Sequence, residues 1–263
     1  IVMAREDARM QDIMETNVIS VTTQEDQESV ARLFSLYDLN VLPVVDTENR
    51  MVGIVTVDDA IDVIEEETTE DISKMAAITP SDRPYLKTSV WMLWKSRIPW
   101  LLLLMLSATF TGAIITHFEN ALAAQVVLTA FIPMLMDTGG NCGSQSSVTV
   151  IRGLSLGQVR FADWLRVLWK ELRVSGLCAL ALAAVNFLRL LVMSSVGTAV
   201  AATVSLTLAV TVLLADLGGG LLPSLAKRLG FDPAVMASPL ITTVVDALSL
   251  LVYFQMASWL LGI

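Results

Sequence analysis

The chain has 263 residues with a formal net charge of −9, and 54% of its residues are hydrophobic. It contains one histidine, two cysteines that lie far apart, and no glycine-rich phosphate loop followed by lysine. These features argue against an enzyme, a metal knuckle and a disulfide framework. We also expect no nucleic-acid partner.

Charge divides the chain into a soluble part and a membrane part. Residues 1–82 hold 19 of the 26 acidic and 5 of the 17 basic residues, a net charge of −14, whereas the remainder is net basic and holds nearly all the long apolar runs. We therefore expect a soluble domain over 1–67, a connecting helix over 68–97 and a membrane domain over 98–263. Because the chain begins without methionine, in a charged stretch, we expect a further N-terminal part to precede it.

The soluble domain is predicted to have the order β-α-β-β-α. Hydrophobic alternation predicts three strands, over residues 18–21, 41–46 and 51–57. An amphipathic helix is expected over 27–37, and a second helix from Asp58 onward. Thr56 and Asp59 suit the start of that second helix, because a threonine cap with an acidic residue three positions later forms a capping box.

The helix that starts at Asp58 carries a dense row of acidic residues. Further acids follow at four-residue steps, at Asp62, Glu66 and Glu70. Like charges at that spacing cost roughly 0.2 to 0.5 kcal/mol per pair. Solvation and salt can offset this repulsion. Divalent cations bound between the carboxylates can also offset it, because hard cations prefer oxygen ligands. Pro80 and Pro84 are expected to interrupt the connecting helix that follows.

Five apolar segments are each longer than the ~20 residues needed to cross a bilayer. They cover residues 98–118, 121–151, 161–193, 198–229 and 233–261. Basic residues gather before the first, between the second and third, and between the fourth and fifth segments. The positive-inside rule then places the N-terminal domain in the cytoplasm and the C-terminus outside. We therefore predict a polytopic α-helical protein of the cell's inner (plasma) membrane, with five transmembrane helices.

The second apolar segment has a polar face that lipid would not tolerate. Four side chains recur near one face at helical spacing, at Thr138, Asn141, Gln145 and Thr149. Gly139, Gly140 and Gly143 leave the same helix without side-chain bulk at these positions. This suits either close packing of a neighbouring helix or a path for a solute. The long polar face favours the path, so we predict that Asp137, Thr138, Gly139, Gly140, Asn141 and Gln145 line a pore.

Acidic residues at membrane depth are functional candidates by default. Asp246 lies in the last apolar segment, Asp216 in the fourth, and Asp137 beside the glycines of the second. No basic residue accompanies them at similar depth, so they are expected to hold protons or attract a cation. Asp216 also suits a hydrogen bond to a neighbouring helix, and Asp137 a helix cap. Asp232 precedes the last segment, where it either caps a helix or shares a cation with the acidic cytoplasmic helix.

The soluble domain resembles a CBS domain. The resemblance is carried by MQDIMETNVISVTTQED and by VLPVVDTENRMVGIVTVDDAIDVI. It implies one copy of a module that usually works in pairs. In that family, the threonine and aspartate that match Thr56 and Asp59 often contact a nucleotide ribose. ATP binding at these two residues is therefore an alternative to their capping role.

The chain as a whole is similar to the MgtE family of magnesium channels and transporters. Three blocks occur in family order: VDDAIDVIEEETTEDI, PMLMDTGGNCGSQSSVTVIRGL and LGFDPAVMASPLITTVVDALSLLVYF. The resemblance implies a homodimer with five spans per subunit and a central pore, in which Asp246 of each subunit holds hydrated Mg²⁺. Some relatives carry a small residue where Asp137 stands, and an additional charge there could change conductance or ion choice.

The resemblance also implies a cytoplasmic magnesium sensor. Its carboxylates correspond to Asp59, Asp62, Glu67, Glu70, Asp71 and Asp232. Bound Mg²⁺ would bridge these acids when cellular magnesium is high and stabilise the closed pore. The predicted function is a magnesium-selective, channel-like importer that cytoplasmic Mg²⁺ closes. Two alternatives stay open: a sodium- or proton-coupled transporter whose coupling ion binds Asp246, and a nucleotide-sensing membrane regulatory protein.

Overall fold

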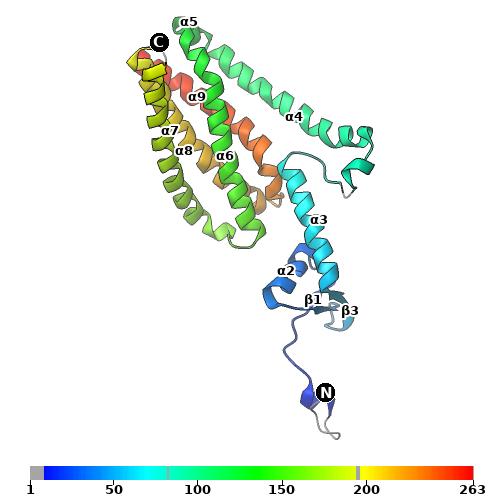
Figure 1. Cartoon of the computed structure of the whole chain (residues 1–263). Coiled ribbons are helices and arrows are strands. Elements are labelled where there is room, and N and C mark those ends of the chain that lie inside the picture. The colour runs from blue at the N-terminus through cyan, green and yellow to red at the C-terminus, as the bar shows by residue number, and fades with distance from the viewer. Residues whose placement is uncertain (1–8, 82, 194–195, 263) are drawn as a thin grey trace. The chain divides into compact units, whose positions relative to one another are not determined.

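The structure is a computed structural model and describes residues 9–81, 83–193 and 196–262 (Figure 1). The chain divides into two compact units, one that ends at Thr69 and one that begins at Glu70. The first contains a small sheet with its helices, and the second is almost entirely helical.

The N-terminal unit is built on a three-stranded sheet in the order β1-β2-β3. Along the chain the elements are α1 (Met10–Ile13), β1 (Val21–Thr22), α2 (Gln27–Tyr37), β2 (Val41–Val45), β3 (Met51–Thr56) and α3 (Val57–Met75). β1 runs parallel to β2, and β2 runs antiparallel to β3. Apart from the short α1, the predicted order β-α-β-β-α is confirmed, and α2 has the predicted bounds.

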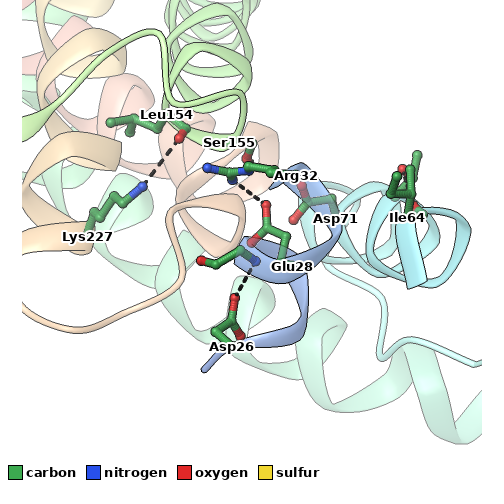
Figure 2. Close-up of polar contacts among 10 residues, drawn as sticks. Asp26, Glu28, Arg32, Ile64, Asp71, Leu154, Ser155 and Lys227 are labelled. Atoms are coloured by element: carbon green, nitrogen blue, oxygen red, sulfur yellow. Dashed lines mark hydrogen bonds and ion pairs between the residues drawn. The ribbon is translucent and has the colours of Figure 1, made fainter. Parts of the chain in front are cut away.

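Hydrogen bonding explains where α2 begins and why β1 is short. The carboxylate of Asp26 accepts a hydrogen bond from the backbone N–H of Ser29 at 3.1 Å and caps α2 (Figure 2). β1 shares only Val21 with the strand predicted over 18–21 and ends one residue later, and it pairs with only the last two residues of β2. The next residue back along β1 would stand opposite Pro43, which has no amide hydrogen for the ladder.

The core of this unit lies between the sheet and the helices α2 and α3. Its buried side chains are those of Val21, Ala31, Phe34, Leu42 and Ala60. One face of α3 therefore packs on the sheet, while the acidic residues of that helix point away from the core.

The segment 68–97, expected as a connecting helix, contains two helix ends and a loop. α3 ends at Met75, where Ala77 takes a left-handed conformation with φ of 52° and the N–H of Ile78 bonds the Ser73 carbonyl at 2.9 Å. After a 3-10 turn at Tyr85–Lys87, α4 begins at Val90, capped by the Ser89 hydroxyl. The break occurs in the proline-containing stretch, as predicted.

The second unit continues as a bundle of long helices. It comprises α4 (Val90–His117), α5 (Glu119–Ala124), a 3-10 turn (Val126–Phe131), α6 (Ile132–Ser155), α7 (Trp164–Met193), α8 (Thr198–Arg228) and α9 (Ser238–Leu261), with further 3-10 turns at Phe161–Asp163 and Pro233–Met236. The segment 121–151, predicted as one span, is thus divided among α5, a 3-10 turn and α6.

Four helical segments within the described ranges are long and apolar enough to cross a membrane. They cover Val90–His117, Trp164–Val192, Thr198–Arg228 and Pro233–Leu261. α6 has 24 residues, a length of about 36 Å, but its polar side chains and glycines keep it outside this group. Composition in the structure therefore supports four of the five predicted spans.

Glycines allow the central helices to approach closely. α6 packs against α8 and α9, α7 against α8, and α4 against α9. A methyl group on Gly219 of α8 would overlap the carbonyl oxygen of Gly143 on α6, so only glycine fits at this crossing. At Gly139, a Cβ atom would lie 2.7 Å from Thr211 Cγ2. α4 differs from these helices, since none of its residues is buried in the single chain.

Candidate ion sites

α6 presents a buried face of small residues and an exposed polar face. Gly139, Gly143, Ser146 and Ser147 are buried against neighbouring helices. The opposite face leaves four polar side chains exposed in the single chain, those of Asp137, Asn141, Gln145 and Thr149. Helical periodicity alone explains the division, because residues four apart share a face.

A cavity of about 450 Å³ opens where this polar face meets α9. Its lining residues are Ile132, Pro133, Met136, Asp137, Gly140, Asn141, Thr242 and Asp246. Two carboxylates, one amide and one hydroxyl thus share a single space. No basic side chain occurs among the described residues that line it.

The start of α9 fixes the position of Asp246. Pro239 stands in the first turn of the helix, and its carbonyl accepts hydrogen bonds from the hydroxyls of Thr242 and Thr243, both at 3.0 Å. One turn further along, the half-buried Asp246 side chain reaches the cavity. The two threonines therefore satisfy their hydroxyls locally, while the carboxylate remains directed at the cavity.

A second polar cluster joins the last residues of α3 to the turn before α9. The Lys74 ammonium forms ion pairs with the carboxylates of Glu70 and Asp232, and it lies 2.5 Å from Asp232 Oδ2. Asp232 also accepts a hydrogen bond from the N–H of Ala234 at 2.8 Å, which confirms its predicted capping role. One ammonium thus occupies the position between two acids that were predicted to share a divalent cation.

Burial and charge act in opposite directions on Lys74. Partial burial works to lower the pKa of its ammonium, but hydrogen bonds and attraction from Asp232 and Glu70 outweigh that effect and raise the pKa above its ordinary value. The side chain therefore stays protonated at physiological pH and remains a permanent positive charge between the two carboxylates.

Neighbouring contacts hold the same region together. Asp71 accepts a hydrogen bond from the Ser155 hydroxyl at 3.5 Å, and Met75 packs on a small buried cluster of Ile151, Ala234 and Ala237. Lys227 of α8 donates to the carbonyl of Leu154 at 3.3 Å, near the end of α6 (Figure 2). The last turn of α3 is therefore attached to the end of α6 and to the turn before α9.

Comparison with known proteins places these sites in a family. Residues 132–256 match the MgtE divalent cation transporter model, and residues 10–66 match the CBS domain. The chain thus contains an MgtE domain that follows a CBS domain. The match to the family model covers α6, α7, α8 and most of α9, and hence all the residues that line the cavity.

Individual MgtE relatives align with almost the whole chain. It is 41% identical over 262 residues to the magnesium transporter MgtE of Thermus thermophilus, which covers 99% of this chain and 58% of the relative. Identity is 37% to the magnesium transporter MgtE of Bacillus subtilis and 33% to that of Enterococcus faecalis, over 98% and 96% of this chain and 56% and 55% of those relatives. The chain thus spans little more than half the length of these curated relatives.

The six acids predicted as the MgtE sensor are divided between the two units, with Asp59, Asp62 and Glu67 in the first and Glu70, Asp71 and Asp232 in the second. Asp59 accepts hydrogen bonds from the hydroxyl and N–H of Thr56, at 2.7 and 3.4 Å, as the capping interpretation predicts. Glu67 accepts one from the Gln27 amide at 2.8 Å. Across the described residues, no group of three or more histidine, cysteine or acidic side chains is placed to hold a metal ion. Within the second unit, Lys74 bridges Glu70 and Asp232.

The predicted pore residues of α6 also separate into two groups. Asp137, Gly140 and Asn141 line the cavity. Gly139 instead packs against α8 and α9, with Thr211 and Ser249 within contact distance of a Cβ atom at this position. Thr138 and Gln145 lie on α6 but outside the residues that line the cavity.

Glu171, a buried carboxylate of α7, is a candidate functional residue that was not predicted from the sequence. It is 9% exposed and accepts a hydrogen bond from the Ser146 hydroxyl at 2.8 Å, and that hydroxyl also lies 2.8 Å from the backbone carbonyl of Asp216. The cluster joins α6, α7 and α8. A usable signal was present, because Glu171 continues the four-residue spacing of the buried Ser175 and Ala179.

Proposed function

We propose that the chain forms the pore and part of the magnesium sensor of a channel-like transporter, which imports Mg²⁺ down its electrochemical gradient. The observation that carries the proposal is the cavity with Asp246 and Asp137 in its lining and no basic residue among the described side chains around it. Carboxylates in such a place attract a cation. The relatives' names, magnesium transporter MgtE, support Mg²⁺ as that cation.

The size of the cavity suits a hydrated ion. Mg²⁺ gives up its water reluctantly, and six waters at ~30 Å³ each occupy roughly 180 Å³. The cavity of about 450 Å³ leaves room for that shell between the lining groups. In this proposal Asp246 holds Mg²⁺ through water, and Asn141 and Thr242 supply further polar contacts to the shell.

The exposed polar face of α6 supports a fifth span and a homodimer. A helix with Asn141 and Gln145 exposed cannot face lipid, since the bilayer offers no hydrogen-bond partner. Its buried face already packs between α8 and α9, two helices that are apolar enough to span. A second copy related by a two-fold axis would cover the polar face, with the ion path between the two copies.

The distribution of charge supports a plasma-membrane protein whose N-terminal domain lies in the cytoplasm and whose C-terminus lies outside. The first turns of α4 add interfacial residues to the basic ones. Trp91 stacks on Trp94 with ring centroids 4.5 Å apart, and the Lys95 ammonium lies 5.8 Å from the Trp91 ring. Tryptophan and lysine together are typical of the boundary between bilayer and water.

For regulation, we propose that cytoplasmic Mg²⁺ binds among the predicted sensor acids and favours the closed state. Six acids take part: Asp59, Asp62, Glu67, Glu70, Asp71 and Asp232. Mg²⁺ must bind the closed state more tightly than the open state, or it could not shift the equilibrium. ATP binding at Thr56 and Asp59 stays a prediction and would require Asp59 to release its capping contact with Thr56.

Magnesium flux into proteoliposomes tests the transport proposal. Wild type and Asp246→Asn would be compared with a fluorescent Mg²⁺ indicator, with and without sodium and proton gradients. We expect flux in wild type that needs neither gradient and disappears in Asp246→Asn. Flux that depends on sodium or protons would instead establish coupled transport, and an active Asp246→Asn variant would remove Asp246 from the ion site.

A further inference from the structure

We propose that Asp137 is a second anionic group of the ion path, which sets the apparent affinity for the entering divalent cation and the preference for divalent over monovalent cations. This inference rests on the proposed transport function. It assigns a role to a residue on a different helix from Asp246, and it follows from where the two helices place their carboxylates.

Helical register brings the two carboxylates to the same level. A Cβ atom on Gly140 of α6 would lie 3.0 Å from Thr242 Cγ2 of α9, so these two residues mark one level of the helix pair. Asp246 follows Thr242 by four residues, about one turn along α9. Asp137 precedes Gly140 by three residues, slightly less than one turn in the opposite chain direction.

Because the chains of α6 and α9 run in opposite directions, these two steps lead the same way. α9 begins just after the turn that contains Asp232. α6 contacts the same turn close to its own end, where Ile151 packs on Ala234 and Ala237. Asp137 and Asp246 therefore lie about one turn beyond the Gly140–Thr242 contact, and both line the same cavity. This register distinguishes Asp137 from an isolated surface carboxylate.

The charge of this cavity suits a divalent ion that keeps its water. In the proposed homodimer the two copies would bring four carboxylates to the path of one Mg²⁺, whereas the variant Asp137→Asn would leave two. Asp137 is also exposed in the single chain, so it reaches the cavity without a costly burial of its own. Carboxylates that line a cleft raise the local concentration of cations before they bind.

The test is the concentration dependence of Mg²⁺ flux for wild type, Asp137→Asn, Asp137→Glu and Asp246→Asn in proteoliposomes. We expect Asp137→Asn to raise the half-saturating Mg²⁺ concentration about five- to tenfold, as loss of one charge from a focusing cleft implies. Saturating Mg²⁺ should largely restore its flux. Asp137→Glu, which keeps the charge, should stay close to wild type.

A second readout separates charge from simple damage to the fold. Competition by Na⁺ and K⁺ against a fixed low Mg²⁺ concentration should strengthen in Asp137→Asn and stay unchanged in Asp137→Glu. The matched control is Glu119→Gln, which removes the same charge from the exposed start of α5, outside the cavity lining. We expect this control to resemble wild type in both assays.

The outcomes distinguish this inference from the transport proposal. If Asp246→Asn abolishes flux while Asp137→Asn matches wild type at every Mg²⁺ concentration, Asp137 has no role in the path although the channel proposal stands. A shift of equal size in Glu119→Gln would also overturn the inference, because it would reflect general surface charge. If Asp246→Asn retains flux, the transport proposal itself fails.

Discussion

Lys74 offers the most direct test of how the last turn of α3 is held. Its ammonium pairs with Glu70 and Asp232, and the three side chains are 25%, 40% and 33% exposed, respectively. Solvent screens such pairs, so we assign about 0.5 kcal/mol to the more exposed Glu70 pair and about 1 kcal/mol to the Asp232 pair. The substitution Lys74→Met removes both pairs and should therefore cost at least about 1.5 kcal/mol in the absence of Mg²⁺. It also leaves two carboxylates facing each other.

Thermal unfolding of the purified protein measures this loss. For a chain of this size, about 1.5 kcal/mol corresponds to a decrease in Tm of roughly 3 to 6 °C in a chelating buffer. Mg²⁺ should restore more Tm in Lys74→Met than in wild type, because the cation can occupy the position that the ammonium leaves and need not displace it. Lys87→Met, which removes an exposed lysine from the 3-10 turn before α4, is the matched control.

The pH dependence of the same contact has a defined sign. The folded-state pKa of Lys74 is raised, so its stabilising contribution is complete below the unfolded value of about 10.4 and is lost only as pH rises through the folded value. The difference in Tm between wild type and Lys74→Met should therefore be constant from pH 7 to 9. An equal Tm loss with and without Mg²⁺, or a loss as large in Lys87→Met, would refute the reasoning.

Two further predictions concern the helix bundle. Gly219→Ala should destabilise the protein by about 1 to 3 kcal/mol, because its methyl group overlaps the Gly143 carbonyl, whereas Gly218→Ala meets nothing within 4 Å and should be neutral or stabilising in the same unfolding assay. Ser146→Ala should lower the free energy of unfolding by about 1 to 3 kcal/mol, because it removes the hydrogen-bond donor to buried Glu171. In the background of Glu171→Gln, the same substitution should cost less. Equal Tm values for the two glycine variants, or additive effects of the second pair, would contradict these contacts.

Local sequence signals predicted the elements whose causes are local. α2 has the predicted bounds because Asp26 caps its start and its apolar residues repeat at helical spacing. The capping role of Asp232 was equally visible, since a proline follows it directly. These contacts involve residues within four positions of each other, where sequence and geometry are closely related.

The features that sequence analysis missed depend on residues far apart in the chain. The length of β1 is limited by Pro43 on the neighbouring strand, and Lys74 meets Asp232 across 158 positions. Glu171 was overlooked because it stands among basic residues, although its helix face is buried by α6 and α8. The spacing of Glu171 with Ser175 and Ala179 indicates a buried helix face, but no short window identifies the partners of these residues, because tertiary packing decides them.

The two faces of α6 should differ in the substitutions that they accept. At Gly143 a Cβ atom would lie 2.8 Å from Ile241 Cγ2 and 3.1 Å from the Ala215 carbonyl oxygen, so the size of the side chain decides and even alanine requires its neighbours to shift. At Asn141 the side chain is exposed and space is available, so the chemical character of the side chain decides. A saturation library across α6 should therefore separate into positions where variants fail to fold and positions where they fold normally but conduct differently.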